Sequence, residues 1–551
     1  MTAVLTEPTP IDTWLLRQQD LSAVERFSAS HDQMEAHGVA VPQGRWRDRL
    51  PATAPGPGQQ YAFEVDLDSC TGCKACVAAC HNLNGLDEGE SWRRVGSLHD
   101  AGAGPGPAGS VTVTSACHHC VDPACMKGCP AQAYEKDPVT GIVRHLDDAC
   151  IGCSYCTLTC PYEVPVFNQS LGIVRKCDLC SDRLAEGEAP ACVQGCPQGA
   201  ITITLASVDD LIAAAAAPDA ALVPTAPRSD LTVPATAYVS RKPVPATWVA
   251  ADRSSVHPSH GHTPLAVMLV LTQAAVGMTV AAAWLRATGR LDGSGPGTLG
   301  SVGLVTGLVA MGASVLHLGR PMLAWRAILG LRRSWLSREI LAFGTFAGAG
   351  VATTAAHVLG LPTLLVDGAQ AATVAGGVAG VACSVQLYAV TGRRWWRART
   401  SGPRFAGTAV TCGALATAAV LALSDPAAAE PLLPLLTAIA IAGLAVSVAA
   451  PLLPLVALDR RRGSGVDELR TTRRLLGHQL QARLALRLGA AAAALVLLAV
   501  AAAATDSLAD GSLRVGVALV LATVVTGLGE YHDHRLFFLA SVAPRMPGSP
   551  R

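Results

Sequence analysis

Sixteen of the eighteen cysteines in this chain lie between Cys70 and Cys196, and they form four runs of four. In chain order the spacings are C-x2-C-x2-C-x3-C, C-x2-C-x4-C-x3-C-P, C-x2-C-x2-C-x3-C-P and C-x2-C-x11-C-x3-C-P. The C-x2-C-x2-C-x3-C-P run is typical of bacterial ferredoxins, in which the fourth cysteine serves the other iron–sulfur cluster of a pair. Sixteen thiolates suffice for four [4Fe–4S] clusters, so the pattern predicts an electron carrier.

All sixteen cysteines of the runs are predicted ligands to iron: Cys70, Cys73, Cys76, Cys80, Cys117, Cys120, Cys125, Cys129, Cys150, Cys153, Cys156, Cys160, Cys177, Cys180, Cys192 and Cys196. Zinc and disulfides are the alternatives. Zinc sites favour paired C-x2-C modules, often with histidine, and disulfides need an oxidising compartment. The N-terminal stretch MTAVLTEPTPIDTWLLRQQD lacks the basic and apolar regions of a signal peptide, which favours iron–sulfur chemistry.

The composition divides the chain into two unlike halves. Half of its 551 residues are hydrophobic and only 15% are charged, against about 25% in typical soluble domains. The cysteine runs end at Cys196, whereas long apolar runs begin at Pro264. The net charge of +1 provides no basic field for nucleic acid, so we expect no nucleic-acid partner.

Four regions are expected along the chain. Residues 1–60 are an N-terminal extension with an amphipathic helix over 11–37, 61–205 are the iron–sulfur domain, 206–263 are a linker and 264–551 are a membrane domain. Alternation over 61–67 predicts a strand, and 142–146 and 200–205 have the same character. Short strands and turns between the runs predict two tandem ferredoxin-like α+β units, which owe much of their order to the clusters.

Eight apolar segments after Pro264 are long enough to cross a bilayer. The predicted spans are 264–285, 297–317, 339–360, 368–391, 405–424, 431–457, 487–505 and 512–529, with Arg514 inside the last. Other charges are nearly absent from the segments, and each would cost roughly 2.5–3.5 kcal/mol at mid-bilayer. We therefore predict an all-α bundle of eight transmembrane helices behind the iron–sulfur domain.

The loops of the membrane half alternate in charge. Arginines gather after the second, fourth and sixth spans: Arg320, Arg326, Arg332, Arg333, Arg338, Arg393, Arg394, Arg397, Arg399, Arg404, Arg460, Arg461, Arg462, Arg470, Arg473, Arg474, Arg483 and Arg487. Basic loops stay in the cytoplasm. We therefore expect a protein of the cytoplasmic (inner) membrane, with both termini and the iron–sulfur domain facing the cytoplasm.

The four runs in this order resemble the iron–sulfur subunit of the dimethyl sulfoxide reductase family of molybdoenzymes, chiefly through CHHCVDPACMKGCP, CIGCSYCTLTCPYEVP and RKCDLC. The membrane half resembles that family's anchor subunit, through HLGRPMLAWRAILGLRRSWLSREI at 317–340 and RLFFLASVAPRMPG at 535–548. The chain thus looks like a fusion of two subunits that are usually separate.

The resemblance implies that each cluster takes three cysteines from one run and the fourth from another. Cys196 would join Cys70, Cys73 and Cys76; Cys80 would join Cys177, Cys180 and Cys192; Cys160 would join Cys117, Cys120 and Cys125; and Cys129 would join Cys150, Cys153 and Cys156. Cys153 fills a position where some relatives have another residue, so four [4Fe–4S] clusters are implied. His81 stands where the pattern has proline, and we expect no ligand role for it.

Two pairs of polar residues beside the runs have open interpretations. The cysteine supply is complete without His118 and His119, so we expect these residues beside a cluster or exposed. Arg175 and Lys176 precede Cys177, and positive charge there would raise the reduction potential of the cluster. A solvated surface pair is the alternative for Arg175 and Lys176.

An electron carrier that ends at a membrane needs a lipid-soluble partner, and quinone chemistry moves protons with electrons. Three ionisable residues are predicted at the cytoplasmic edge of the bundle, namely His317, Glu339 and Glu530, and Arg320 is expected to orient His317 or a quinone oxygen. The alternatives are a structural histidine at a helix end and salt bridges from the glutamates to loop arginines. No second central histidine faces His357, so no haem is expected.

Two functions follow from these features. The first is an electron-transfer and membrane-anchor subunit between the quinone pool and a separate molybdopterin catalytic subunit, since this chain has no P-loop or dinucleotide fingerprint. Such a chain would not itself convert the terminal substrate. The alternative is redox-driven translocation of protons or ions, which would need acidic or histidine side chains along the middle of several helices. The sequence places Asp367, Asp425 and Glu430 at the outer edge instead.

Overall fold

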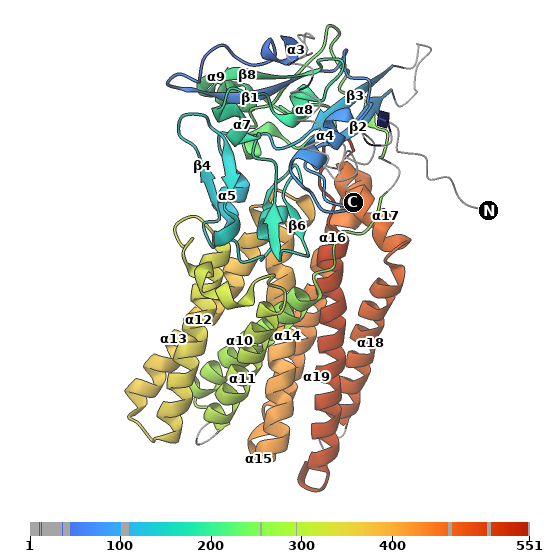
Figure 1. Cartoon of the computed structure of the whole chain (residues 1–551). Coiled ribbons are helices and arrows are strands. Elements are labelled where there is room, and N and C mark those ends of the chain that lie inside the picture. The colour runs from blue at the N-terminus through green and yellow to red at the C-terminus, as the bar shows by residue number, and fades with distance from the viewer. Residues whose placement is uncertain are drawn as a thin grey trace, which may run out of the picture.

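The computed structural model of the chain has a cysteine-rich part of short strands and helices at one end of a bundle of long helices (Figure 1). The structure describes residues 44–100, 109–253, 256–291, 293, 295–460, 466–503 and 508–548, with a few isolated positions before residue 44. The amphipathic helix predicted over 11–37 lies outside the described residues, apart from those isolated positions.

A three-stranded sheet covers the end of the cysteine-rich part that is remote from the bundle (Figure 1). Its order is β8 (Ile201–Ser207), β1 (Gln59–Asp66) and β9 (Ala237–Val239). β1 runs antiparallel to β8 and parallel to β9. Phe63 and Val65 of β1 are buried, as expected for a strand with one face on a core. The strands predicted near 61–67 and 200–205 are therefore confirmed.

Three smaller sheets surround the cysteine runs. They are β10 (Val249–Ala250) with β2 (Arg94–His99) and β3 (Ser110–Ser115), the pair β4 (Tyr134–Lys136) and β5 (Val143–His145), and the pair β6 (Val166–Asn168) and β7 (Ile173–Arg175). The helices between them are short: α4 (Ala75–Leu83), α5 (Ala124–Gly128), α6 (Tyr155–Thr159), α7 (Ser181–Ala185) and α8 (Ala191–Gln194). β5 confirms the strand predicted over 142–146, and the α+β class is confirmed.

The segment expected to be a linker, 206–263, pairs with these sheets at two places. β9 lies beside β1, and β10 lies beside β2. Helix α9 (Val208–Ala215) begins after Ser207, whose hydroxyl accepts a hydrogen bond from the Asp210 amide at 3.3 Å, a normal N-terminal cap. The linker segment is thus held against the domain by main-chain hydrogen bonds.

Among the residues that the structure describes, the bundle contains eight helices long and apolar enough to cross a membrane, with mean hydropathies between 1.2 and 2.3. They are α10 (Thr263–Ala287), α11 (Gly295–Val315), α12 (Trp335–Val358), α13 (Thr363–Ala389), α14 (Ala398–Ser424), α16 (Leu433–Val456), α18 (Gln481–Ala503) and α19 (Leu508–Leu539), of which Leu513–Leu539 is the apolar part. The prediction of an all-α bundle with eight spans is confirmed.

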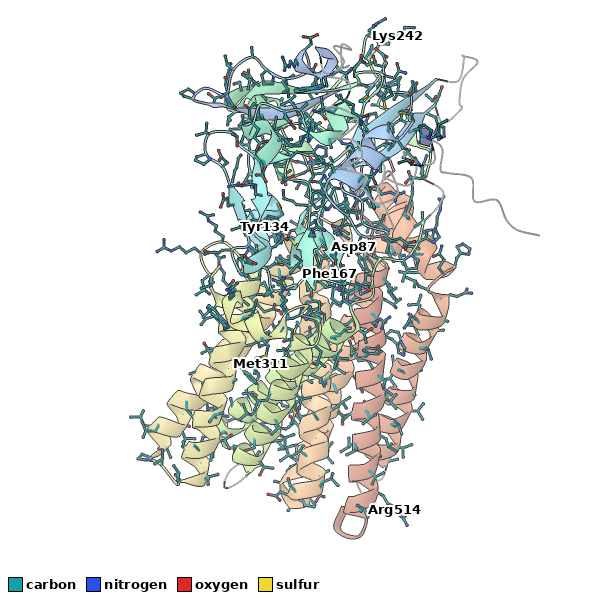
Figure 2. All side chains as sticks on the ribbon, viewed as in Figure 1. Asp87, Tyr134, Phe167, Lys242, Met311 and Arg514 are labelled. Carbon is teal, nitrogen blue, oxygen red and sulfur yellow. The ribbon has the colours of Figure 1, made fainter. Side chains whose placement is uncertain are left out.

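The predicted ends of some spans were wrong. The last helix continues to Leu539 rather than stopping at 529, so Glu530 lies inside α19 and not at its end. Arg404, expected in a loop, lies within α14, and Arg487, expected where a loop meets the seventh span, lies in the second turn of α18. The charged side chains enter the bundle because they pair there, as described below. Arg514 lies at the end of the bundle remote from Lys242 (Figure 2), where a charge can reach water.

The loop between α11 and α12, which includes the short helix η3 (Pro321–Ile328), joins the bundle to the cysteine-rich part. The Gly319 amide donates to the Gly152 oxygen at 3.2 Å, and the Gly330 amide donates to the Pro130 oxygen at 2.7 Å. A Cβ atom on Gly319 would lie 2.1 Å from the Gly172 oxygen, so this close approach of two backbones requires glycine.

Candidate functional site

In all four runs, the third cysteine is the second residue of a short helix. These residues are Cys76 in α4, Cys125 in α5, Cys156 in α6 and Cys192 in α8. The fourth cysteine follows four residues later, which is about 6 Å farther along at a helical rise of about 1.5 Å per residue. One run therefore presents thiols at two separate places, about one helical turn apart.

The cysteines come together in four sets of four, which we call sites 1 to 4. Sites 1 to 3 each line a cavity, and in site 4 the thiols interact electrostatically with one another. Each set takes three cysteines from one run and one from another. The members are Cys70, Cys73, Cys76 and Cys196 in site 1; Cys177, Cys180, Cys192 and Cys80 in site 2; Cys117, Cys120, Cys125 and Cys160 in site 3; and Cys150, Cys153, Cys156 and Cys129 in site 4.

Left-handed backbone conformations wrap the first and third runs around sites 1 and 4. Gly72 and Gly152 have φ angles of 73° and 70°, a region that glycine adopts without strain. Lys74 and Ser154 follow with φ angles of 61° and 56°, immediately before α4 and α6. The two runs thus share one loop conformation, and the C-x-G-C sequence common to both provides for it.

Main-chain amides point at the sulfur atoms. The Ala133 amide donates to Cys129 Sγ at 3.2 Å, the Ala200 amide to Cys196 Sγ at 3.3 Å, and the Gly152 amide to Cys150 Sγ at 3.4 Å. Hydrogen bonds of this kind favour the thiolate form of cysteine. Hydrogen bonds to sulfur are also among the factors that set the potential of an iron–sulfur cluster.

The thiols lie in surroundings that disfavour a free thiolate. Burial raises the pKa of Cys80 to about 12 and raises the pKa values of Cys160 and Cys180 to about 11. Such thiols are neutral near pH 7, so the anionic form that ligates iron requires a bound cation. Four converging sulfur donors at each site and amides directed at sulfur fit a [4Fe–4S] cluster.

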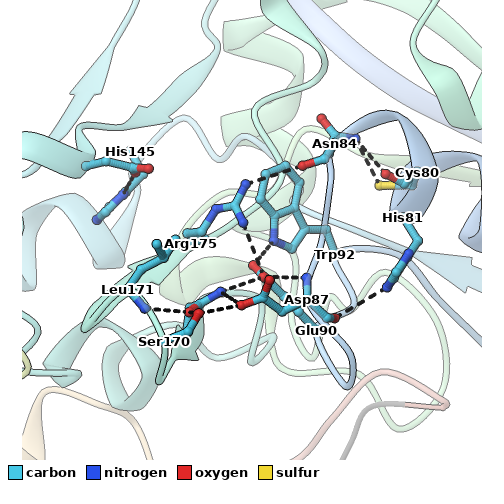
Figure 3. Close-up of polar contacts among 12 residues, drawn as sticks. Cys80, His81, Asn84, Asp87, Glu90, Trp92, His145, Ser170, Leu171 and Arg175 are labelled. Atoms are coloured by element: carbon cyan, nitrogen blue, oxygen red, sulfur yellow. Dashed lines mark hydrogen bonds and ion pairs between the residues drawn. The ribbon is translucent and has the colours of Figure 1, made fainter. Parts of the chain in front are cut away.

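The two cations before Cys177 have different surroundings. Lys176 is buried, lines the cavity of site 3 and donates its Nζ to the Cys177 oxygen at 2.8 Å. Arg175 pairs with Glu90 at 3.3 Å and lies 5.1 Å from the ring centre of Trp92 (Figure 3). The alternative of a solvated surface pair is therefore wrong for Lys176, which faces thiols.

The histidines near the runs hydrogen-bond to protein groups. His118 is buried with its Nδ1 at 2.8 Å from Thr236 Oγ1, and burial lowers the pKa of His118 to about 3. His119 Nδ1 accepts from the Val143 amide at 3.1 Å. His81 Nε2 lies 3.3 Å from the Asp87 oxygen (Figure 3). These contacts position the loops around the sites.

Site 4 adjoins the membrane helices. Tyr155, the residue before Cys156, donates its hydroxyl to the Leu387 oxygen of α13 at 2.6 Å. Tyr155 belongs to the same buried cluster as Tyr388 and Trp396 of the bundle. Sequence reasoning missed Tyr155, although its place between two cysteines of the third run is visible in the sequence and puts it beside a cluster.

Glu339 is buried in the second turn of α12, close to Tyr155. It is 5% exposed and accepts a hydrogen bond from Ser384 of α13. Tyr155 and Tyr388 lie within electrostatic reach of its carboxylate. Glu339 forms no ion pair with an arginine within the part of the chain that the structure describes, so a salt bridge does not account for its burial.

His317 and Arg320 both lie just beyond the end of α11. His317 donates from Nδ1 to the Ser314 oxygen, which leaves Nε2 as the proton acceptor of the ring, and burial lowers the pKa of His317. Arg320, expected to orient His317 or a quinone oxygen, donates from its guanidinium to the Asp147 oxygen at 2.8 Å. Arg320 thus holds the segment that leads into site 4.

Glu530 belongs to a buried ionic network between α14, α16, α18 and α19. It pairs with Arg487 at 2.6 Å and accepts from Thr408 at 2.7 Å and Ser447 at 2.9 Å. In the same network, Asp533 pairs with Arg404 at 2.5 Å. The salt-bridge alternative thus holds for Glu530, but with arginines inside helices. Glu530 and Asp533 are therefore buried acids within α19, whereas the sequence predicts Glu530 at the membrane edge.

Comparison with known proteins supports this division of the chain. Residues 110–205 match a family model described as a 4Fe-4S dicluster domain, and residues 257–531 match one described as the DMSO reductase anchor subunit. The B subunit of the anaerobic dimethyl sulfoxide reductase of Escherichia coli (strain K12) is 40% identical over 148 residues, which are 26% of this chain and 72% of that protein.

Two further relatives match the same half of the chain. The B subunit of the anaerobic dimethyl sulfoxide reductase of Haemophilus influenzae is 36% identical over 160 residues, which are 28% of this chain and 77% of that protein. The hydrogenase-2 operon protein HybA of Escherichia coli O157:H7 is 36% identical over 171 residues, or 27% of this chain and 52% of that protein.

Proposed function

Because this chain belongs to the family of dimethyl sulfoxide reductase B subunits and continues into a dimethyl sulfoxide reductase anchor domain, we propose that it carries electrons between the membrane quinone pool and a separate molybdopterin catalytic subunit. It is an electron-transfer iron–sulfur subunit fused to its membrane anchor. The terminal substrate would be converted on the catalytic subunit and not on this chain.

Each of sites 1 to 4 would hold one [4Fe–4S] cluster through its four cysteines. The bound clusters would supply one-electron transfer. This chain would supply the thiolates, the amides of Ala133, Ala200 and Gly152 directed at sulfur, and the burial that excludes water. Ligation would also stabilise the fold, since cysteines from separate runs would be joined through iron.

The observation that carries the proposal is the order of the sites. Helix α4 bears Cys76 of site 1 and Cys80 of site 2, and α5 with its next residue bears Cys125 of site 3 and Cys129 of site 4. Cys177 of site 2 lies within electrostatic reach of Cys117 of site 3. The sites therefore form a continuous series from site 1 to site 4.

The two ends of the series have different surroundings. Site 4 contacts the membrane helices through the Tyr155–Leu387 hydrogen bond, whereas Cys73 of site 1 is exposed. An electron donor or acceptor in the membrane would meet site 4, and a water-soluble subunit would meet site 1. We infer that the catalytic subunit docks beside Cys73.

His317 and Glu339 would handle the protons of the quinone. Oxidation of a quinol releases two electrons and two protons. The neutral His317 ring has Nε2 free to accept one proton, and the buried Glu339 carboxylate, without an arginine partner among the described residues, would accept the other. The electrons would leave one at a time through site 4, and the reverse sequence would reduce a quinone.

The arginine-rich loops support a cytoplasmic position for the iron–sulfur domain. Arg320 and Arg326 of the loop between α11 and α12 donate to the oxygens of Asp147 and Asp148. The domain therefore lies on the side of the bundle where the basic loops gather, and basic loops favour the cytoplasm.

The second function, redox-driven ion translocation, is less favoured. Its strongest support is the ionic network of α19, because Glu530 and Asp533 are buried within the bundle. Each of these carboxylates is paired with an arginine. A carboxylate held by a guanidinium is a poor proton carrier, since protonation would leave a buried arginine without its partner.

The proposal is tested by purifying the intact chain from membranes in a mild detergent. We expect a brown protein with about sixteen iron atoms and sixteen acid-labile sulfides per chain, as four [4Fe–4S] clusters require, and a co-purifying large subunit that contains molybdopterin. A colourless protein, or one that contains zinc without labile sulfide, would exclude the proposal.

A further inference from the structure

Arg93 is a buried cation between two of the cysteine sites. It lies directly before β2 and is 1% exposed. Its side chain lines the cavity of site 2. Its guanidinium is within electrostatic reach of Cys80, Cys177 and Cys192 of site 2, and also of Cys76 of site 1. Arg93 is far in sequence from the cysteines of the second and fourth runs, so no spacing rule points to it.

The groups around Arg93 hold its guanidinium in place without neutralising it. Nη1 donates to Thr114 Oγ1 at 3.3 Å, and Cζ lies 4.6 Å from the ring centre of Phe63. Nη2 is buried and has no hydrogen-bond partner among the described nitrogen and oxygen atoms, while the side chain reaches the Cys192 thiol of site 2. No carboxylate pairs with Arg93 among the residues that the structure describes, and its strongest electrostatic partners are thiols.

A buried cation is costly unless an anion faces it. Arginine stays protonated at physiological pH, so its positive charge is fixed. A [4Fe–4S] cluster with four thiolates is anionic and becomes more negative by one charge on reduction. Net charge and hydrogen bonding set the potential of such a cluster, so a fixed cation beside it favours the reduced form.

We propose that Arg93 is a positioning residue that raises the reduction potentials of the clusters at sites 1 and 2. This inference rests on the proposed ligation of these sites. The Arg93 side chain lines the cavity of site 2 and reaches the Cys192 thiol there. Thr114, whose hydroxyl lies 3.6 Å from Cys76 Sγ, links the guanidinium to site 1. Each cluster takes up one electron, and Arg93 neither gains nor loses a proton.

Lys176 provides a comparison within the same domain. Its Nζ donates to the backbone oxygens of Val143 and Cys177, so peptide groups offset part of its desolvation. It faces Cys117 and Cys125 of site 3 together with Cys177 of site 2. One buried cation therefore lies between sites 1 and 2, and another lies between sites 2 and 3.

The test is a potentiometric titration of the purified holoprotein, followed by EPR. In Arg93→Gln, the clusters at sites 1 and 2 should become harder to reduce. At a fixed potential, their ratio of reduced to oxidised cluster should fall at least tenfold, which corresponds to a shift of 59 mV for a one-electron centre. The other two should stay unchanged. Cys196→Ser and Cys80→Ser identify the signals of sites 1 and 2. Arg228→Gln is the control, because it removes an exposed arginine that pairs with Asp230.

Arg93→Lys keeps the charge on a shorter side chain, so we expect a smaller shift in the same two centres. If Arg93→Gln loses its clusters, Arg93→Lys is titrated alone, and sites 1 and 2 must still be the centres that shift. Unchanged potentials in the assembled variant, or equal shifts in all four centres, would overturn the role of Arg93. Absence of iron from the wild-type protein would instead overturn the proposed function.

Discussion

Tyr155 donates its hydroxyl to the backbone oxygen of Leu387 at 2.6 Å, although the two residues are 232 positions apart. Tyr155 begins helix α6 of the third cysteine run, and Leu387 lies in the last turn of the membrane helix α13. The bond therefore joins the loop of site 4 directly to the bundle. It also satisfies a carbonyl near a helix end, where no partner exists within the helix.

Tyr155→Phe tests this junction. The substitution keeps the ring in its buried cluster but leaves the Leu387 oxygen without its donor, at a cost of about 1–3 kcal/mol. We expect a lower thermal midpoint in detergent, measured by the loss of the soluble monomer peak. Tyr61→Phe, at a partly exposed tyrosine of β1, is the matched control. Equal midpoints for Tyr155→Phe and the wild type would show that the hydrogen bond contributes little.

The exchange of cysteines between runs predicts which EPR signal each variant alters. Cys196→Ser should perturb the centre that contains Cys70, Cys73 and Cys76, although Cys196 belongs to the fourth run. Cys80→Ser, in the first run, should perturb the centre of Cys177, Cys180 and Cys192. The reason is that these thiols line the same cavities. Signals that follow run membership instead would contradict the arrangement.

His317 and Glu339 are predicted to handle protons at the membrane edge. His317→Ala and Glu339→Gln should each slow the reduction of the clusters by a quinol analogue by about 100-fold, at the lower end of the range for general acid–base catalysis. The iron content should not change. The measurement is stopped-flow bleaching of cluster absorbance, with dithionite as a reductant that bypasses the quinone site.

His357→Ala is the control for that experiment. His357 lies in the last turn of α12, at the other end of the helix from Glu339, so its loss should leave the rate unchanged. If both His317→Ala and Glu339→Gln are reduced at the wild-type rate, neither residue belongs to the quinone site.

Arg487 is predicted to stabilise the bundle through Glu530. Arg487→Met would leave a carboxylate that is fully buried without its cation, and loss of one partner of a buried pair typically costs about 3–5 kcal/mol. The double variant Arg487→Met with Glu530→Gln removes both charges and should recover much of the lost stability. Thermal midpoints of the four proteins form a double-mutant cycle. Additive losses would mean that the pair is not coupled.

The elements that could be predicted from sequence are those with a pattern in the residues of their own segment. Cysteine spacing and short alternating strands are local signals, and they correctly predicted β1, β5 and β8. Apolar length likewise predicted eight spans. Contacts between distant segments carry no such signal. Arg93 meets its thiols only after the runs fold together, and Tyr155 meets Leu387 only when the two halves dock.

The predicted ends of some spans were wrong for a related physical reason. Arg404 and Arg487 are charged, so hydropathy places them at the boundary between a basic loop and a span. In the structure, their charges face Asp533 and Glu530 inside the bundle. Pairing lowers the cost of burying each charge, and a window of residues read along one helix cannot detect a partner on another.

Sidedness is tested by labelling with a membrane-impermeant maleimide. Lys242 lies on the iron–sulfur domain and Arg514 at the opposite end of the bundle (Figure 2), so Lys242→Cys and Arg514→Cys report the two faces of the membrane. Because basic loops favour the cytoplasm, we expect Arg514→Cys to be labelled in spheroplasts and Lys242→Cys only in inside-out vesicles. In detergent, both introduced cysteines should be labelled, which controls for their reactivity with the maleimide. Labelling of Lys242→Cys in intact spheroplasts would place the iron–sulfur domain outside and contradict the topology.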